Sequence, residues 1–489
     1  MKVEFSVEEE VLNDEFANDI LGIETVKDNT LSIIDKVGLT ANLTEKGVIV
    51  EDTEKKTKGM VERECKESKE EVKLDKNEES NISNDEIKVS NMIVDKKEKI
   101  EEIELNSNNN VNSDEINQNA RFLLGIDIRN NEKIYWEYMN KQLNNRHLLI
   151  NGNSGSGKTY CIQALILEAI KNNISVIVFD YTDGFTRSKL SPILLEKIGD
   201  NFESRLVKYK KFPINPFKKG TITTEEGDME ELDQDVANRI ADSFAKVYKF
   251  KEQQRSAIYV AVREALKEYG ETMTLETLRE KLQESDNKSA VTVLSKIEPL
   301  VDYEPFLGDS SFSWKDIVEA KGQMYVIQLT GYTREIQLIL TELILWDIWN
   351  YSIKYGNEST PMPLVLDEAQ NLSHDENSPS GKILAEGRKF GVSGWYATQF
   401  MAGRLTPGEI GNLQQAAQKL YFSSPENSIV EVSKYIDITN EGSKAWAEKL
   451  SKLTKGYCVT SGYKANNNRF DKYEPRIIKI TSLEERISE

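Results

Sequence analysis

The stretch GNSGSGKT, residues 152–159, matches the phosphate-binding pattern G-x-x-x-x-G-K-[ST]. It follows the apolar run RHLLIN (146–151) and precedes YCIQALILEAIKNN (160–173), which has the composition of a helix. Glycines let backbone N–H groups turn inward on phosphates, and a helix points its positive end at them. A strand, this loop and a helix in direct succession predict a P-loop nucleotide site. The alternative, an accidental loop of glycine and serine, would rarely have both neighbours.

The residues of this loop have separate expected tasks. Lys158 would reach the β- and γ-phosphates, and the Thr159 hydroxyl would ligate Mg²⁺. The other residues expected around the phosphates are Gly152, Asn153, Ser154, Gly155, Ser156, Gly157 and Tyr160. ATP and Mg²⁺ are therefore the predicted cofactors.

A second apolar run ends in two carboxylates, in PLVLDEAQ at 363–370. Asp367 would hold the metal through water, and Glu368 would polarise the attacking water. The alternative is a pair of surface carboxylates that caps a helix. Because a glutamate directly follows the aspartate, hydrolysis is favoured over nucleotide binding alone. Gln399 ends the next apolar run, VSGWYATQ (392–399), where it would sense the γ-phosphate.

Short apolar runs alternate with amphipathic segments from Phe122 onward, which predicts an α/β fold with a mainly parallel sheet and crossover helices. The expected strands lie at 146–151, 175–180, 322–329, 363–368 and 392–399, and shorter ones in KLYFS, GYCVT and PRIIKIT extend one edge. Helical spacing of apolar residues predicts an insertion between the second and third strands. The predicted parts are a first part of the ATPase core at 121–219, a helical insertion subdomain at 220–321 and a second part of the core at 322–489.

The first 120 residues differ from the rest in charge and composition. They hold 31 acidic and 16 basic residues, so −15 of the chain's net charge of −19 lies there. Low hydrophobicity with high charge does not offset the entropy cost of ordering, so residues 56–120 are predicted to be an acidic, Asn-rich disordered linker. Residues 1–55 carry enough aliphatic side chains for a small strand pair or a partner-docking segment. The alternative is a solvated tail.

Cysteine and histidine usage excludes several classes of protein. The chain has two histidines, His147 and His374, and three widely spaced cysteines, Cys65, Cys161 and Cys458. A structural zinc site or a disulfide framework is therefore not expected, and the usage fits a reducing cytoplasm. The start lacks the apolar run of a signal peptide. The most apolar stretch, 336–353, is interrupted by polar residues, so it predicts a buried helix and no membrane span.

Three of these motifs together resemble one family. GNSGSGKT, PLVLDEAQNL and AEGRKFGVSGWYATQF (385–400) are similar to the HerA/FtsK superfamily of hexameric DNA-pumping ATPases. Within it they resemble the HerA-like branch, which includes ATPases of prokaryotic anti-phage systems such as DptH. The resemblance covers residues 122–481, and FPINPF at 212–217 adds to it. It implies a RecA-like (ASCE) P-loop core, a homo-oligomer in the form of a hexameric ring, and double-stranded DNA as the substrate.

The resemblance also implies a task for Arg388, in the string EGRKFGV. In the family an arginine of this stretch faces the nucleotide of the neighbouring subunit, and such a guanidinium can raise the rate about a thousandfold or more. The alternative is that Arg388 packs or pairs within its own subunit, for example with Glu386. Arg334 and Arg404 are weaker candidates for the same task.

The sequence departs from the family pattern at several places. The acidic motif reads DEAQ rather than DEAH, Phe400 stands where many relatives have Arg-Pro, and the second strand ends in DYTDGF. The family's N-terminal β-barrel is not recognisable in the acidic quarter. The change at Phe400 puts one possible DNA or interface contact in doubt, and the missing barrel puts the usual partner-docking surface in doubt, whereas the ATP site is intact.

A basic segment is the candidate DNA contact. VKYKKFPINPFKKG (207–220) interleaves aromatic residues with five lysines, Lys208, Lys210, Lys211, Lys218 and Lys219. Six copies of such a loop around a channel would grip phosphates without reading sequence. The alternative is a solvated basic loop.

The predicted function is an ATP-hydrolysing DNA translocase or helicase that acts as a ring, with a nuclease or other defence effector as its partner. The chain shows no nuclease constellation, so the partner would process DNA ends. A second hypothesis is a scaffold whose ATP-controlled assembly organises a partner effector. A third is a conjugation or secretion ATPase of the same superfamily, which the lack of a membrane-spanning stretch disfavours.

Overall fold

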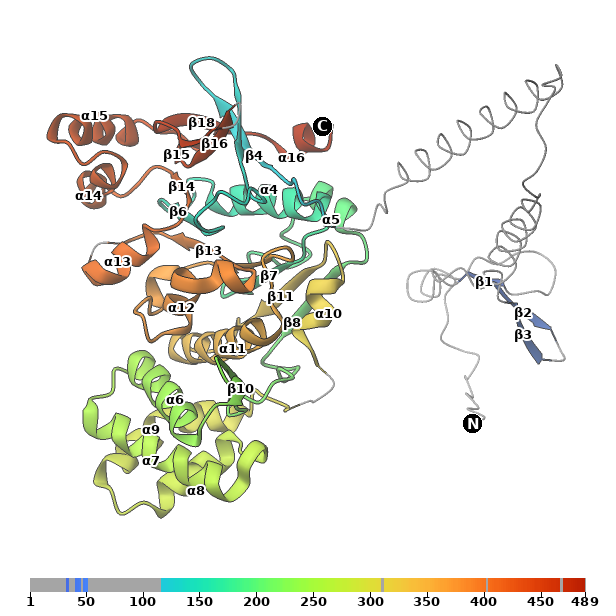
Figure 1. Cartoon of the computed structure of the whole chain (residues 1–489), viewed down its shortest axis with the longest axis vertical. Helices are drawn as coiled ribbons and strands as arrows, with labels where there is room; N and C mark the ends of the chain where they lie inside the picture. Colours follow the sequence, from blue (N-terminus) through green and yellow to red (C-terminus); the bar gives the residue numbers. More distant parts are fainter. Residues whose placement is uncertain are drawn as a thin grey trace, which may run out of the picture. The chain divides into compact units, whose positions relative to one another are not determined.

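One large sheet organises the main domain of the computed structural model (Figure 1). The structure describes residues 116–308, 312–401, 403–466 and 469–488, together with three short strands nearer the N-terminus. Within these residues the large sheet has eleven strands, of which the predicted ones supply the centre.

The centre of the sheet is parallel. In spatial order its strands are β14 (Gln418–Tyr421), β6 (Leu148–Asn151), β13 (Val392–Thr398), β12 (Met362–Leu366), β7 (Val176–Asp180), β11 (Met324–Gln328) and β8 (Phe202–Leu206). Every residue of the five strands from β6 to β11 is buried. Such strands are covered on both faces, which is the reason that they appear in the sequence as continuous apolar runs.

An antiparallel extension continues the sheet beyond β14. In spatial order it consists of β15 (Tyr457–Ser461), β18 (Arg476–Ile480), β4 (Phe122–Asp127) and β5 (Lys133–Trp136). A small hairpin of β16 (Tyr463–Asn466) and β17 (Arg469–Lys472) connects β15 with β18. The strands expected near the end of the chain therefore extend one edge, as predicted. The sequence pattern did not indicate β4, β5 or β8.

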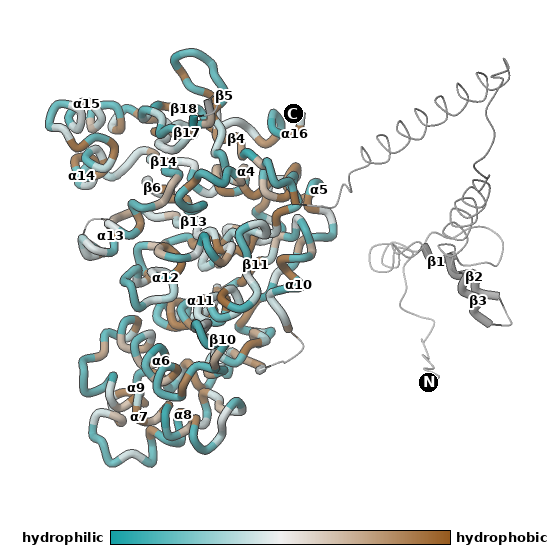
Figure 2. Tube along the Cα trace, in the orientation of Figure 1, coloured by the Kyte–Doolittle hydropathy of each residue, from teal (hydrophilic) through white to brown (hydrophobic). Residues whose placement is uncertain are grey.

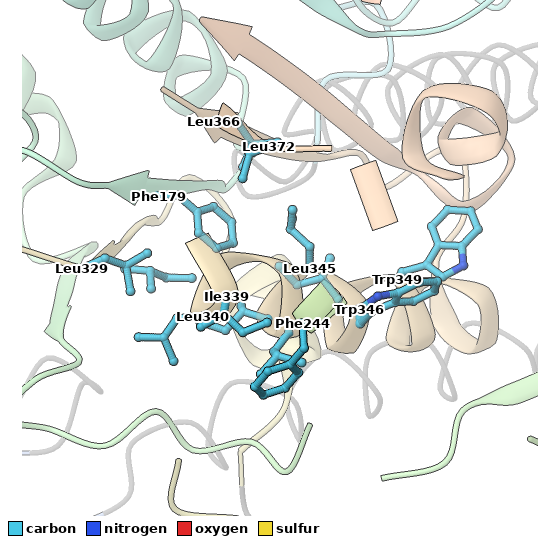
Figure 3. Close-up of a cluster of buried hydrophobic side chains, with 14 of the residues drawn as sticks. Phe179, Phe244, Leu329, Ile339, Leu340, Leu345, Trp346, Trp349, Leu366 and Leu372 are labelled. Atoms are coloured by element: carbon cyan, nitrogen blue, oxygen red, sulfur yellow. The ribbon is translucent and has the colours of Figure 1, made fainter. Parts of the chain in front are cut away.

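Alternate residues of the buried strands enter two separate cores. On β7, Val176 and Val178 pack with α4 (Lys158–Lys171) and α5 (Pro192–Ile198) on one face. Ile177 and Phe179 pack with α11 (Arg334–Tyr355) and α12 (Pro379–Glu386) on the other. Figure 3 shows this second core, with Phe179 above the leucine and isoleucine side chains of α11. The period of two along a strand thus explains why both helical layers are needed.

The insertion after β8 packs against α11. It consists of a hairpin, β9 (Thr221–Thr224) and β10 (Gly227–Glu230), and the helices α6 (Asp233–Tyr248), α7 (Glu252–Tyr269), α8 (Leu275–Glu284) and α9 (Lys288–Tyr303). Hydrophilic and hydrophobic residues alternate along these helices (Figure 2), as in helices with one buried face. Ile240 and Phe244 lie in the shared core, and Trp346 Nε1 donates to Ser243 Oγ at 3.2 Å. The segment expected to be helical therefore opens with two strands.

The remaining helices lie in the last third of the chain and before β11. They are α10 (Trp314–Glu319), α13 (Pro407–Leu413), the hairpin of α14 (Glu426–Ile436) and α15 (Asn440–Ser451), and the terminal α16 (Leu483–Ile487). In the described ranges, none of the helices has an apolar stretch that would reach across a membrane. In α11, buried Glu342 and half-buried Asp347 interrupt the apolar run.

The N-terminal quarter belongs to a separate unit, residues 1–109. There β1 (Ser32–Ile34), β2 (Thr40–Thr44) and β3 (Gly47–Glu51) pair antiparallel, in the segment for which a strand pair is one of the expectations. The predicted linker lies outside the described residues as far as 115. Its last part does not: Ala120 is buried in the main domain, and its carbonyl accepts a hydrogen bond from Met139 N at 3.1 Å. The main domain thus includes residues before the predicted boundary at 121.

Candidate nucleotide-binding site

The P-loop lies between the carboxyl end of β6 and the start of α4. Gly155 and Gly157 have φ angles of 77° and 113°, which residues with side chains rarely adopt. This backbone turns successive N–H groups toward one point, as phosphate binding requires. The first turn of α4 carries no acidic residue, so nothing there offsets the positive end of the helix.

Lys158 lies inside the loop. Its Nζ donates to Gly152 O at 2.7 Å and to Asn153 O at 2.9 Å, and the side chain is largely buried. Burial lowers the pKa of Lys158, while the nearby carboxylates of Asp367 and Glu368 act in the opposite direction. The ammonium is thus positioned between the loop and the two carboxylates that the sequence pairs with it.

Asp367 and Glu368 follow the carboxyl end of β12. Asp367 Oδ1 accepts a hydrogen bond from Glu368 N at 2.9 Å. Burial raises the pKa of Asp367, and the neighbouring charge of Glu368 raises it further. Glu368 itself has a φ of 56°, a left-handed backbone that is costly for a residue with a side chain. Such strain at a strand end is typical of a functional position and argues against a simple surface pair.

Two glutamine side chains hold the carboxylate of Glu368. Gln399 Nε2 donates to Glu368 Oε1 at 2.5 Å, and Gln370 Nε2 donates to Glu368 Oε2 at 2.6 Å. Gln370 Oε1 also accepts a hydrogen bond from Gln399 N at 3.2 Å. Sequence reasoning singled out Gln399 but not Gln370. The signal for Gln370 was present, because it is the residue at which DEAQ departs from DEAH.

The loop behind Glu368 is anchored by His374. Its Nε2 lies 2.8 Å from Ala369 O, and its Nδ1 lies 2.7 Å from Ser380 Oγ. Burial lowers the pKa of His374 to about 4, so the ring is neutral: Nε2 donates to the carbonyl and Nδ1 accepts from the hydroxyl. His374 N also donates to Glu409 on α13, at 3.1 Å. The loop that follows Glu368 is therefore held to both α12 and α13.

The loop after β7 is shaped by Asp180. Its Oδ1 accepts hydrogen bonds from Thr182 N at 3.1 Å and Gly184 N at 3.0 Å, and its Oδ2 accepts from Phe185 N at 3.0 Å. These bonds place Thr182 at the edge of the site. The DYTDGF segment thus forms this loop around the carboxylate of its own first residue, Asp180.

A cavity of about 410 Å³ unites these elements. It is lined by Ser154, Gly155, Gly157, Lys158, Thr159, Tyr160, Thr182, Asp367, Glu368, Gln399 and Lys455. The Thr159 hydroxyl and the Asp367 carboxylate supply the oxygen ligands that Mg²⁺ prefers. In the described residues no group of three or more acidic, histidine or cysteine side chains forms a complete metal site. That donor set fits an ion that takes its other ligands from water and phosphate.

Arg388 lies away from this cavity. It follows α12, before the first residue of β13, whereas Gln399 follows the last residue of β13. Seven residues of strand, roughly 20 Å, separate the two. Arg388 Nε pairs with Glu358 Oε1 at 2.6 Å, and its Nη2 donates to Lys141 O at 2.7 Å. Its partner within the chain is thus Glu358 rather than the Glu386 that the sequence alternative names.

The two weaker arginine candidates have local partners. The Arg334 guanidinium lies 4.8 Å from the centre of the Tyr181 ring and donates to Gln337 Oε1 at 3.2 Å. Arg404 donates to Asn371 Oδ1 at 3.1 Å, three residues after Glu368 in the chain. Arg404 is therefore closer to the catalytic loop than Arg388 is.

Three of the five candidate DNA-binding lysines have partners within the chain. Lys208 donates to Gly331 O at 2.6 Å, Lys211 pairs with Glu304 at 2.5 Å, and Lys219 pairs with Asp233 at 3.0 Å. Lys210 and Lys218 are exposed. Of the interleaved aromatic residues, Phe212 and Phe217 are core residues and Tyr209 is 80% exposed. The segment thus presents Tyr209, Lys210, Lys211 and Lys218 to solvent, and of these Lys211 is paired with Glu304.

Comparisons with known proteins bear on the fold and on the family resemblance. Residues 136–348 match the family model described as the central domain of the helicase HerA. VirB4 of Thermoanaerobacter pseudethanolicus is similar at 17% sequence identity, over 75% of this chain and 98% of that one, with a TM-score of 0.55. Plasmid coupling protein TrwB, solved with an ATP analogue, is similar at 16% identity over 74% of this chain and 94% of its own, with a TM-score of 0.47. No curated protein matches the sequence significantly. The predicted resemblance to HerA and the RecA-like P-loop fold are confirmed.

Proposed function

We propose that this chain, whose residues 136–348 match the HerA central-domain model, hydrolyses ATP to move DNA. One observation carries the hydrolysis step. Glu368 stands at a strained strand end with both carboxylate oxygens held by glutamines, across the cavity from Lys158 and Thr159. A carboxylate fixed in this way can act as the base that polarises a water beside a bound γ-phosphate.

Four other lining residues have a proposed role in this reaction. Thr159 and Asp367 would hold Mg²⁺, which would neutralise charge on the phosphates. Lys158 leaves the carbonyls of the loop for the β- and γ-phosphates. Gln399 bonds the same carboxylate that orients the water, so loss of the γ-phosphate changes a contact at the end of β13. That contact couples hydrolysis to the strand and to α13 beyond it.

The DNA step is supported by the HerA family model. We place duplex DNA in the channel of a homo-oligomeric, hexameric ring, with Tyr209, Lys210 and Lys218 as the exposed contacts. A nuclease or other defence effector is the proposed partner that processes the DNA. Cys161 and Cys458 are buried free thiols, which agrees with the proposed work in a reducing cytoplasm.

ATP turnover with and without linear duplex DNA at low salt tests this function. We expect DNA to raise turnover several-fold, and added salt to abolish the effect. Glu368→Gln is expected to bind ATP but to lose about a hundredfold or more in rate. Lys210→Glu combined with Lys218→Glu should remove the stimulation and keep the basal rate, whereas Lys288→Glu, an exposed lysine on α9, should keep both.

Two results would contradict the proposal. Near-normal turnover by Glu368→Gln would remove the assigned base. Turnover that duplex DNA leaves unchanged at every salt concentration would favour the ATP-controlled scaffold instead.

A further inference from the structure

The α14–α15 hairpin begins and ends at the P-loop. In the segment that leads into the hairpin, Ser423 O accepts a hydrogen bond from Asn153 N at 2.7 Å. In the segment that leaves the hairpin, Gly456 N donates to Ser156 O at 3.2 Å. The loop that would cradle phosphates is therefore held on both sides by the chain segments that enter and leave this hairpin.

Lys455 lies in the segment that leaves the hairpin and lines the nucleotide cavity. Its side chain is exposed, and within the described residues no hydrogen-bond or ion-pair partner holds its ammonium. Two neighbouring lysines have partners within the hairpin. Lys452 pairs with Glu448 at 2.6 Å, and the Lys449 ammonium lies 4.2 Å from the centre of the Trp446 ring. Lys455 is thus a charge that faces the cavity without a counter-charge of its own.

Lys455 and Lys158 approach the P-loop at different points. Lys158 bonds the carbonyls of Gly152 and Asn153, and its charge is coupled to Asp367 and Glu368. Lys455 directly precedes Gly456, whose N–H donates to the carbonyl of Ser156. The backbone of Gly456 also packs closely against Gly157, because a Cβ atom added at Gly157 would lie 3.4 Å from Gly456 N. Backbone N–H groups of this part of a P-loop cradle the α- and β-phosphates, whereas the motif lysine reaches the β- and γ-phosphates.

We propose that Lys455 is a nucleotide-binding residue that contacts the α- and β-phosphates. This assignment rests on the proposed ATP site. Because ADP and ATP share both phosphates, Lys455 strengthens the binding of both equally. Uniform binding of this kind lowers KM and does not change kcat. The ammonium also balances charge, since the cavity otherwise sets one lysine and two carboxylates against a polyphosphate.

Calorimetric titration of the full chain with ATP, ADP and inorganic tripolyphosphate tests this proposal. Lys455→Met is expected to raise the Kd of all three about tenfold, as loss of a charge-assisted hydrogen bond would. KM for ATP should rise similarly and kcat should stay within about twofold of the wild type. Lys455→Arg should recover most of the affinity. The matched control, Lys452→Met, removes an equally exposed charge from the same hairpin and should leave every Kd unchanged.

The outcomes separate this proposal from the proposed function. If the wild type binds and hydrolyses ATP and Lys455→Met does the same with unchanged Kd, Lys455 has no such task. Weakened ATP and ADP binding with unchanged tripolyphosphate binding would assign Lys455 to the ribose or base, against the proposal. A fall in kcat at unchanged Kd would also overturn it.

If the wild type binds no nucleotide, the proposed function fails and this assignment fails with it. Equal melting temperatures of the two methionine variants without nucleotide would exclude a merely structural effect.

Discussion

At the scale of single residues, burial decides which acidic groups carry charge. Glu342 lies in the middle of α11 and is 3% exposed. Burial raises its pKa to about 8, so the folded protein holds this carboxyl protonated at neutral pH. It lines a cavity of about 200 Å³ together with Lys246 of α6 and Asp375, which form an ion pair. A protonated carboxyl is compatible with this apolar helix where a charged one is not.

Glu342→Gln is expected to stabilise the protein in a pH-dependent way. In the unfolded chain a glutamate ionises near 4.5, whereas in the fold its pKa is about 8. The raised pKa therefore does not lower the free energy of unfolding below pH 4.5, and it lowers that free energy progressively more between pH 4.5 and pH 8. Glutamine avoids this cost, so the variant should gain roughly 3 to 5 kcal/mol of unfolding free energy above pH 8 and almost nothing at pH 4.5.

Urea unfolding at several pH values measures this difference. The control is Glu298→Gln, an exposed carboxylate of α9, which should change the unfolding free energy by less than about 0.5 kcal/mol at each pH. A gain for Glu342→Gln that is independent of pH would contradict the account, because it would not arise from ionisation.

At the scale of elements, a buried ion pair fastens α16 to the domain. Arg486 is 1% exposed, pairs with Glu168 of α4 at 3.2 Å, and donates to Leu124 O of β4 at 3.0 Å. Glu168 Oε2 also accepts a hydrogen bond from Leu123 N at 3.2 Å. A helix of five residues makes few contacts of its own, so these bonds keep the last helix of the described chain in place.

Arg486→Met is expected to lower the unfolding free energy by about 3 to 5 kcal/mol, since it leaves Glu168 buried without its partner. Adding Glu168→Gln should restore part of this loss, because it removes the uncompensated charge. Lys452→Met, which breaks an exposed pair on α15, should cost under about 1 kcal/mol. Denaturant unfolding measures all three. If Arg486→Met and Lys452→Met lowered the unfolding free energy equally, burial of the Arg486–Glu168 pair would contribute nothing to stability.

At the scale of the whole molecule, the two ends of the parallel sheet carry different groups. The P-loop, Glu368 and Gln399 lie at the carboxyl ends of the strands, and Arg388 lies at the amino end of β13. A rigid sheet does not bring these ends together within one subunit. If Arg388 takes part in hydrolysis, it does so at the nucleotide site of a neighbouring copy.

Mixing Arg388→Ala subunits with Lys158→Ala subunits tests this arrangement. Each variant alone should be inactive. In mixed rings, an intact Lys158 site can face a neighbour with an intact Arg388, so a one-to-one mixture should recover up to about a quarter of the wild-type turnover. Lack of recovery, with subunit exchange shown by differently tagged copies, would assign Arg388 to its pair with Glu358.

Patterns within short stretches were sufficient for much of the fold and the site. The buried strands are continuous apolar runs, so β6, β7, β11, β12 and β13 were predictable. β8 was not, because its residues are half-buried and include charged side chains. The P-loop and the DE pair of the site are sequence motifs, whereas the bond of Gln370 to Glu368 and the position of Lys455 at the cavity are seen only in the structure.

The sequence by itself determined that a strand, a glycine-rich loop and a helix would make a P-loop, because that geometry depends on neighbours in the chain. It also determined which strand ends carry the carboxylates and Gln399. Only the tertiary structure decided that Glu368 is held by two glutamines, that the lysines of 208–219 turn to separate partners, and that Lys455 enters the cavity. The Gln370 contact joins residues only two apart, but the other contacts join residues distant in sequence. The physical reason is that strand order and helix packing, which no local pattern records, bring those residues together.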